Sequence, residues 1–99
     1  MAFYRVFLKG TGIQVSNPVG GDSLIGFYTT RAVRAGSVEE AVERAKTLVN
    51  ADWASGIYQA TNAGKRPSLT VENVFPDHFF GYLMFRNKGY TFYPDSDEN

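Results

Sequence analysis

The adjacent residues Asp77 and His78, in the segment FPDHFF, are the part of this sequence whose types and spacing could carry catalysis. A carboxylate that orients an imidazole can create a general base that works near neutral pH. Neighbouring residues rarely point at one common site, however, and no second catalytic partner accompanies the pair. We therefore interpret Pro76-Asp77-His78 as a surface turn, keep Asp77 and His78 as catalytic candidates, and expect that the protein is not an enzyme.

Composition removes several other kinds of chemistry. The chain contains no cysteine, which excludes disulfides, thiolate nucleophiles and cysteine-ligated metals. One histidine and scattered carboxylates do not form a metal-ligand pattern, so we expect neither a metal nor a cofactor. Gly10-Thr11-Gly12 begins like a dinucleotide-binding fingerprint, but the third glycine and the following helix are missing.

Length and charge favour a small soluble protein. The 99 residues suffice for one domain with one core, which we place at 1–94, and we expect 95–99 to be a disordered acidic tail. Ten basic residues balance ten acidic ones, so the net charge does not indicate a nucleic acid or a membrane as the partner. The first ten residues lack the apolar core of a signal peptide, and no run is long enough to cross a bilayer. We therefore expect a cytoplasmic protein.

A helix after Gly36 is indicated by a capping pattern and by periodicity. Ser37 and Glu40 form a capping box, in which the Ser37 hydroxyl accepts the N–H of Glu40 and the Glu40 carboxylate reaches back to the N–H of Ser37. Apolar residues then recur every three or four positions on one helical face: Val38, Ala41, Val42, Ala45, Leu48, Val49 and Trp53. The opposite face is polar, and we expect water to cover it: Glu39, Glu43, Arg44, Lys46 and Asn50.

Strands are predicted on both sides of this helix. Residues 3–9 alternate with a period of two, Gly10 to Gly12 indicates a bulge or bend, and a continuation at 13–15 leads through a loop to a return strand at 24–34. After the helix, Gly56 is a candidate cap, and we expect a short strand or irregular chain at 57–61 and a strand at 69–75. An apolar run at 79–86 leads through the hairpin loop Asn87-Lys88-Gly89 into a strand at 90–93.

These elements define the predicted fold class. It is α+β, with an antiparallel sheet of four or five strands in the order β-β-α-β-β, room for an extra short strand, and one long amphipathic helix packed on one face. Alternation along the strands then directs aromatic residues to the other face: Phe3, Phe7, Tyr28, Phe79 or Phe80, and either Tyr90 with Phe92 or Thr91 with Tyr93.

The exposed aromatic face needs a cover. The chain has eight Phe, six Tyr and one Trp, and half of them on one face would form an apolar patch too large for a monomer to expose. A second subunit, the loop 10–23, a small ligand or stacked nucleobases could cover it. We expect self-association first, because symmetric dimers are the commonest oligomers.

A short resemblance points to RNA. The segment Lys88-Gly89-Tyr90-Thr91-Phe92-Tyr93 resembles the first half of the octapeptide of the RNA-recognition motif, which presents aromatic rings to bases, and Val6-Phe7-Leu8 is similar to the companion hexapeptide. The resemblance implies a nucleic-acid-binding sheet face. The chain departs from that family at Thr91, Tyr93 and Asp95, and no helix separates its first two predicted strands. We therefore interpret Lys88-Gly89 as part of an ordinary hairpin turn.

Three functions remain for comparison. The leading hypothesis is a non-enzymatic interaction or regulatory domain that dimerises, or docks a protein partner, through a predicted binding face: Phe3, Arg5, Phe7, Lys9, Tyr28, Tyr90 and Phe92. The second is single-stranded nucleic-acid binding, with rings stacking on bases and cations on phosphates: Phe7, Tyr90 and Phe92, with Arg5, Lys9 and Lys88. The third is a small ligand-binding protein or enzyme that uses four side chains: Tyr28, Arg31, Asp77 and His78.

Overall fold

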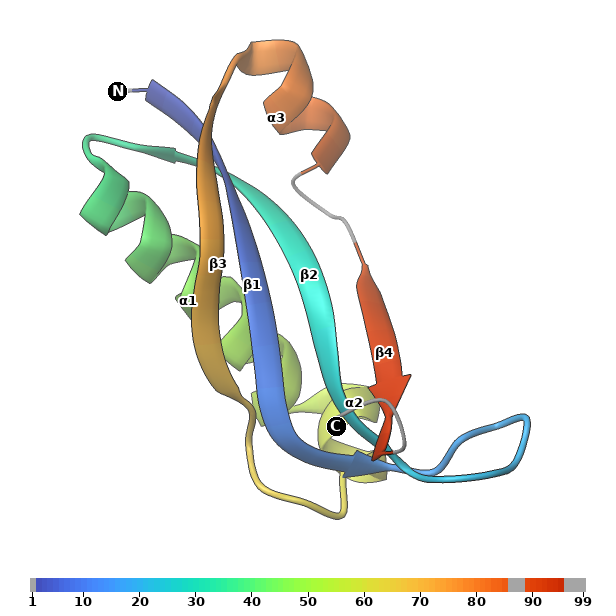
Figure 1. The fold of residues 1–99 in the computed structure, drawn as a ribbon. Helices are drawn as coiled ribbons and strands as arrows, with labels where there is room; N and C mark the ends of the chain where they lie inside the picture. The colour runs from blue at the N-terminus through green and yellow to red at the C-terminus, as the bar shows by residue number, and fades with distance from the viewer. Residues whose placement is uncertain (1, 86–88, 96–99) are drawn as a thin grey trace.

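Four strands form the centre of the molecule. A computed structural model describes residues 2–85 and 89–95, which form β1 (Ala2–Val15), β2 (Leu24–Ala35), α1 (Val38–Ala54), α2 (Gly56–Thr61), β3 (Ser68–Asp77), α3 (Phe79–Phe85) and β4 (Tyr90–Pro94). The strands pair in the order β3-β1-β2-β4, with every neighbouring pair antiparallel, so the first hairpin lies in the middle of the sheet (Figure 1). The predicted α+β class and four-stranded antiparallel sheet are confirmed.

The β1–β2 hairpin follows the predicted alternation. Its register runs without a break from the pair Ala2 and Ala35 to the pair Thr11 and Gly26, and it shifts before Val15. Gly12 lies in this break with φ of +89°, a backbone conformation that glycine adopts most readily. The predicted bend at residues 10–12 is therefore confirmed. In Figure 1 the lower part of β1 curves sideways, toward the lower end of β4.

Helix α1 begins at the predicted cap. The Ser37 Oγ accepts the backbone N–H of Glu40 at 3.2 Å. The Glu40 carboxylate reaches back as expected, but it accepts the N–H of Gly36 at 3.4 Å, one residue before the predicted donor. It also accepts a hydrogen bond from the Arg44 side chain at 3.0 Å, which is the expected i,i+4 pair.

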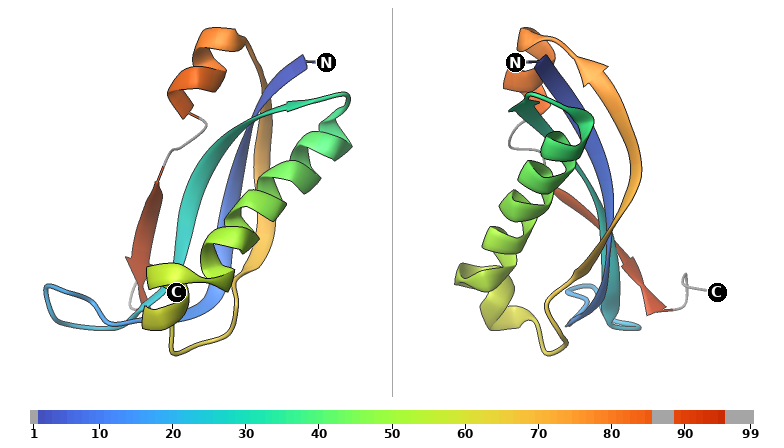
Figure 2. Two further views of the ribbon diagram at one scale, coloured as in Figure 1. Left: turned by 180° about the vertical axis from the view of Figure 1, so that it is seen from behind. Right: turned by 90° about the vertical axis from the view of Figure 1, so that its left-hand side faces the viewer.

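The core lies between α1 and one face of the sheet. Its buried apolar residues come from β1, β2 and α1: Val6, Leu8, Ile13, Phe27, Val33, Ala35, Ala41, Ala45, Val49 and Trp53. The Trp53 ring stacks on the Phe27 ring with centroids 5.3 Å apart and planes within 4°. Figure 2 shows α1 running beside the sheet. The buried stripe of α1 is narrower than predicted, since Val38 and Leu48 are 46% and 43% exposed.

Two segments that were expected to be extended are helical. Residues 57–61 belong to α2, which starts at Gly56 with φ of +70°, so both expectations for this segment are wrong. Residues 79–85 form α3, where the His78 carbonyl accepts the N–H of Tyr82 at 2.9 Å. The described residues thus contain three helices, and the prediction of a single helix is wrong. Short apolar runs do not distinguish helix from strand, because both can bury such a run.

The last strand also differs from its predicted pairing. Strand β4 pairs with β2, and its partner was expected to be the run at 79–86. The predicted hairpin loop includes residues 87 and 88, which lie outside the described residues, as does the predicted tail beyond Asp95. Asp95 itself donates its backbone N–H to the Ser23 carbonyl at 3.1 Å.

The position of Phe27 in the core depends on Gly10. A Cβ atom at residue 10 would overlap the Phe27 ring, because the ring lies directly on the Gly10 backbone. We expect Gly10→Ala to lower the free energy of unfolding by about 1–3 kcal/mol, the usual effect of overpacking a tight core. Urea denaturation followed by Trp53 fluorescence measures this.

The matched control is Gly36→Ala. A Cβ at residue 36 meets only a carboxylate oxygen of Glu40, at 3.6 Å, which is ordinary contact. This variant should keep its stability within about 0.5 kcal/mol. Equal stability of the two variants would contradict the packing of Phe27 on Gly10.

Candidate functional site

The face of the sheet opposite α1 carries most of the predicted binding residues. Residues that are paired across antiparallel strands point to the same side, and Lys9 pairs with Tyr28 while Phe7 pairs with Thr30. Residues Val6 and Leu8, which alternate with them, are fully buried in the core. The structure therefore brings five predicted residues to this outer face: Phe3, Arg5, Phe7, Lys9 and Tyr28.

A band of aromatic rings crosses this outer face. We call Phe75 of β3, Phe7 of β1, Tyr28 of β2 and Tyr93 of β4 the aromatic strip. The Phe7 and Tyr28 rings stack with centroids 5.6 Å apart and planes within 19°, and the Tyr28 and Tyr93 centroids are 5.7 Å apart. Phe75 pairs with Arg5 across β3 and β1 and is 46% exposed. The rings of Phe7, Tyr28 and Tyr93 are half-buried. The strip has one member on each strand.

A glycine makes room for the end of the strip. A Cβ atom at Gly26 would overlap the Tyr93 phenol, so the Tyr93 ring can lie on the sheet only because residue 26 has no side chain. From the sequence, either Tyr90 with Phe92 or Thr91 with Tyr93 could lie on the outer face. Gly26, which pairs with Tyr93, is the signal that could have favoured Tyr93.

Lys9 supplies a positive charge above two rings of the strip. Its Nζ lies 5.8 Å from the Tyr28 ring centroid and 5.5 Å from that of Tyr93. A cation at this distance is attracted by the negative face of the ring, typically by about 0.5–1 kcal/mol at an exposed site. The outer face thus combines an aromatic strip with three cations: Lys9 over the rings, Arg5 bound to Asp77, and the exposed Arg34, which pairs with Phe3.

Phe3 lies at one end of the outer face, under α3. Its ring centroid is 6.0 Å from that of Phe79 and 5.2 Å from that of Tyr82. Phe80, which follows Phe79 in α3, is 71% exposed. Helix α3 therefore covers Phe3 and adds exposed aromatic surface of its own at this end.

Asp77 binds Arg5 and does not orient the His78 ring. Its carboxylate accepts hydrogen bonds from the Arg5 Nε at 2.9 Å and Nη2 at 3.2 Å, and it is 1% exposed against 34% for Arg5. It also accepts the backbone N–H of His78 at 2.9 Å. The Arg5 hydrogen bond is the main reason that the pKa of Asp77 lies below its ordinary value; burial opposes this shift.

The His78 imidazole has a structural contact. Its Nδ1 accepts the backbone N–H of Gly81 at 3.3 Å, which satisfies an amide at the start of α3. The carboxylate of Asp77 lies against Gly81, where a Cβ atom would overlap it. The predicted base and its orienting carboxylate are therefore not assembled as a catalytic pair.

Tyr90 and Phe92 lie on the opposite face from the one predicted. The Phe27 ring contacts both, with centroids 4.8 Å from Tyr90 and 6.2 Å from Phe92, and Trp53 contacts both as well. Because residues alternate along β4, Tyr93 on the outer face requires Tyr90 and Phe92 on the inner one. Both are partly buried against the core.

A polar cluster beside these rings was not predicted. The Asp52 carboxylate of α1 accepts hydrogen bonds from the Arg31 Nη2 at 2.9 Å and from the Tyr90 hydroxyl at 2.6 Å. The Arg31 guanidinium lies 5.1 Å from the Tyr90 ring centroid. Burial is the main reason that the pKa of Tyr90 is raised, and the hydrogen bond to Asp52 adds to it. Arg31 is a charged residue on the core side of β2, between Thr29 and Val33. Its position is the signal in the sequence that could have indicated a buried partner.

The residues of the third hypothesis are not brought together. Arg31 faces α1, Tyr28 lies on the outer face, and Asp77 is bound to Arg5. In the part of the chain that the structure describes, no group of three His, Asp or Glu side chains could hold a metal ion.

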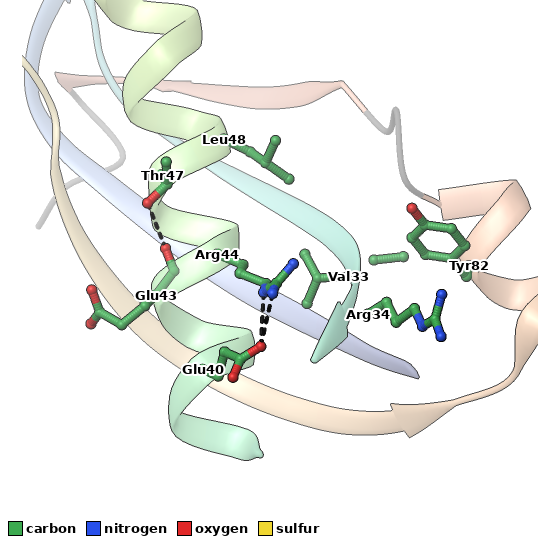
Figure 3. A pocket seen from close by; sticks show the side chains of 9 residues that line it. Val33, Arg34, Glu40, Glu43, Arg44, Thr47, Leu48 and Tyr82 are labelled. Carbon is green, nitrogen blue, oxygen red and sulfur yellow. Dashed lines mark hydrogen bonds and ion pairs between the residues drawn. The ribbon is translucent and has the colours of Figure 1, made fainter. Parts of the chain in front are cut away.

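A pocket of about 520 Å³ lies between α1, β2 and Tyr82 of α3 (Figure 3). Its charged walls include Arg44 and Glu40, whose atoms Nη2 and Oε1 are 2.9 Å apart. Because this carboxylate already binds Arg44 and caps α1, it is not a free acid or base. The Glu40–Arg44 pair is therefore part of the helix surface that borders this pocket.

Comparison of the chain with known protein families, with curated protein sequences and with solved structures finds no match. Among residues 2–85 and 89–95, every helix is too short or too polar to cross a bilayer. The outer face with its aromatic strip is consequently the site on which a functional proposal can be built.

The Arg5–Asp77 pair makes stability depend on pH. The folded pKa of Asp77 lies below the ordinary value of about 3.9, so its stabilising effect is present above that value and is lost as the pH falls through the folded pKa. We expect Asp77→Asn to lower the thermal midpoint at pH 7, and the gap to wild type to shrink as the pH falls from about 4 to 2. Glu72→Gln, at an exposed carboxyl of the same strand, should keep the wild-type midpoint. A gap that stays constant with pH would contradict this role of Asp77.

The cluster of Arg31, Asp52 and Tyr90 should stabilise the fold. We expect Asp52→Ala to lower the free energy of unfolding by about 2 kcal/mol, less than for a fully buried pair because Asp52 is 38% exposed. Tyr90→Phe removes one hydrogen bond and should cost about 1 kcal/mol. Adding Arg31→Met to Asp52→Ala should restore part of the loss, because no unpaired charge then remains. Urea denaturation of the wild type, these variants and the single variant Arg31→Met measures these values, and fully additive effects of Asp52→Ala and Arg31→Met would rule out the cluster.

Proposed function

We propose that this chain is a non-enzymatic interaction domain that self-associates, with two copies meeting through the aromatic strip. In this proposal α1 packs on the inner face of the sheet and supports it, which leaves the outer face for the partner. The observation that carries the proposal is the strip itself, because partly exposed rings lie on all four strands and three of them, Phe7, Tyr28 and Tyr93, contact one another in turn. Aromatic residues are enriched at the centres of protein interfaces.

The charges on the outer face are compatible with a second copy of itself. In a twofold interface each residue meets the same surface on the partner, so unpaired like charges would oppose association. The Arg5 charge is neutralised within the chain by Asp77. The Lys9 charge lies over Tyr28 and Tyr93, where ring faces of either copy can hold it. The remaining cation of this face, the exposed Arg34, pairs with Phe3 at the α3 end.

The size of the strip also supports a dimer. A standard interface buries roughly 800 Å² on each partner, around an apolar centre with a polar rim. A fully buried aromatic side chain accounts for about 150–250 Å², so the exposed parts of four rings, each less than half exposed, supply part of such a centre and neighbouring side chains must supply the rest. Phe80 at the α3 end, 71% exposed, extends the apolar surface.

Single-stranded nucleic acid is the second candidate, and the rings beneath Lys9 are the observation that favours it. Two of its three predicted stacking residues, Tyr90 and Phe92, pack toward the core. Of its predicted phosphate contacts, Arg5 is bound to Asp77 and Lys88 lies outside the described residues. The balanced net charge of the chain gives no long-range attraction to phosphates. A protein surface is therefore the better match. A cytoplasmic location remains a prediction from the sequence.

Light scattering over a range of concentrations tests the proposal. We expect the wild type to approach twice its mass of 11.0 kDa. Phe75→Glu should remain monomeric, because it places a charge on the most exposed ring of the strip, inside the proposed interface. Val38→Glu is the matched control, since Val38 is also 46% exposed but lies on α1, and this variant should still dimerise.

Two outcomes would contradict self-association through the strip. A wild type that stays monomeric at all concentrations would remove the second copy as partner, and salt-dependent binding of a single-stranded oligonucleotide would then support the second candidate. A Phe75→Glu protein that dimerises like wild type would show that the interface lies elsewhere.

A further inference from the structure

A second apolar concavity lies at the opposite end of the sheet from α3. There α2, the end of the β1–β2 hairpin and β4 converge (Figure 1). They enclose a pocket of about 640 Å³, within the range of roughly 300–1,000 Å³ that is usual for small-molecule sites. Eight residues line it: Val15, Ser16, Pro18, Leu24, Ile57, Tyr58, Thr61 and Phe92.

The floor of the pocket is continuous with the hydrophobic core. Val15, Tyr58 and Phe92 are partly buried and pack against the core cluster. The Tyr58 ring lies 4.9 Å from the Trp53 ring and 5.1 Å from the Tyr90 ring, measured between centroids. These contacts hold the floor in place without a ligand.

The wall formed by α2 is fixed to β1. The Asn62 side chain at the end of α2 accepts the Gln14 backbone N–H at 2.9 Å, and the Ala63 N–H donates to the Gln14 carbonyl at 2.8 Å. With Tyr58 turned inward, its neighbour Ile57 is left 73% exposed at the rim. A large apolar side chain is thus held in water beside an open apolar pocket.

The lining specifies the chemistry of an occupant. None of the eight residues carries a charge at neutral pH, so nothing in the lining would neutralise an ionic ligand. The polar groups are hydroxyls of Ser16, Tyr58 and Thr61. The Thr61 hydroxyl donates to the Ile57 carbonyl at 2.7 Å, which leaves its oxygen free to accept a hydrogen bond.

We propose that this pocket binds a small neutral apolar molecule, with an aliphatic or aromatic body and one hydrogen-bond donor for the Thr61 oxygen. The molecule would cover Ile57 and rest on Tyr58 and Phe92. Binding here does not require self-association, because the aromatic strip lies on the outer face and the pocket opens beside α2 on the inner one.

The single tryptophan of the chain provides a reporter. Trp53 is 1% exposed and stacks against Tyr58 in the pocket floor, so a bound fluorescent probe would change its emission. The probe is N-phenyl-1-naphthylamine, which is neutral and apolar, carries one N–H and becomes fluorescent out of water. We expect saturable binding with a Kd of roughly 10–100 µM, as ligand efficiency suggests for a molecule of this size.

Variants assign the binding to this pocket. Ile57→Glu and Ser16→Glu place a charge at the rim from two different walls, and each should weaken probe binding at least about tenfold. Leu48→Glu, which alters the pocket beside α1, and Phe75→Glu, which alters the aromatic strip, should stay within about twofold of wild type. Thermal unfolding of each variant verifies that it is folded.

Three results of these measurements would each overturn the proposal. They are the absence of saturable binding to wild type, unchanged binding by both rim variants, and an equal loss in Leu48→Glu or Phe75→Glu. Conversion of a dimer to a monomer by Ile57→Glu would show that a second copy fills the pocket. If Phe75→Glu is monomeric and still binds the probe, self-association and the pocket are separate properties.

Discussion

The stack of Trp53 on Phe27 is the contact on which the rest of the structure depends. Phe27 can lie at the core side of β2 only because Gly10 on the neighbouring strand has no side chain. Trp53 then packs parallel to Phe27 and holds the C-terminal half of α1 against the sheet. Tyr58 and Tyr90 contact Trp53 in turn, so α2 and β4 are placed by the same rings. One glycine, one phenylalanine and one tryptophan thus connect five elements: β1, β2, α1, α2 and β4.

Polar contacts complete this arrangement at its margins. Asp52 precedes Trp53 in α1 and binds both Arg31 and Tyr90, so the helix contacts β2 and β4 through charge as well as through rings. On the outer face Arg5 and Asp77 join β1 to the end of β3. The Arg31–Asp52 and Arg5–Asp77 pairs each link elements that are distant in sequence. Such pairs favour one packing over others only if all of their partners are present.

Much of the fold could be predicted from sequence because its signals are local. The alternation along 3–9, the glycines of the bend and the capping box of Ser37 and Glu40 act within a few residues. Residues 57–61 and 79–85 were predicted wrongly because neither segment shows a helical period of apolar residues. The first segment is shorter than two helical turns, and the second is almost uniformly apolar. The faces of Tyr90 and Tyr93 depend on Gly26, a residue more than sixty positions away, and the partner of Arg31 depends on how α1 packs against β2. Of the predicted binding residues, those on β1 and β2 were placed correctly on the outer face, because alternation alone determines their side.

Strand β4 makes the two faces of the sheet thermodynamically dependent on each other. Its five residues place Tyr93 in the aromatic strip, Tyr90 in the polar cluster and Phe92 in the apolar pocket, and they pair only with the first half of β2. A short edge strand is among the elements that separate first in local opening. If both proposed sites are occupied, binding at Tyr93 and binding beside Phe92 each favour the state in which β4 is paired, so each strengthens the other only to the extent that β4 opens. This coupling needs no change of shape, only that both sites require the same strand to be in place.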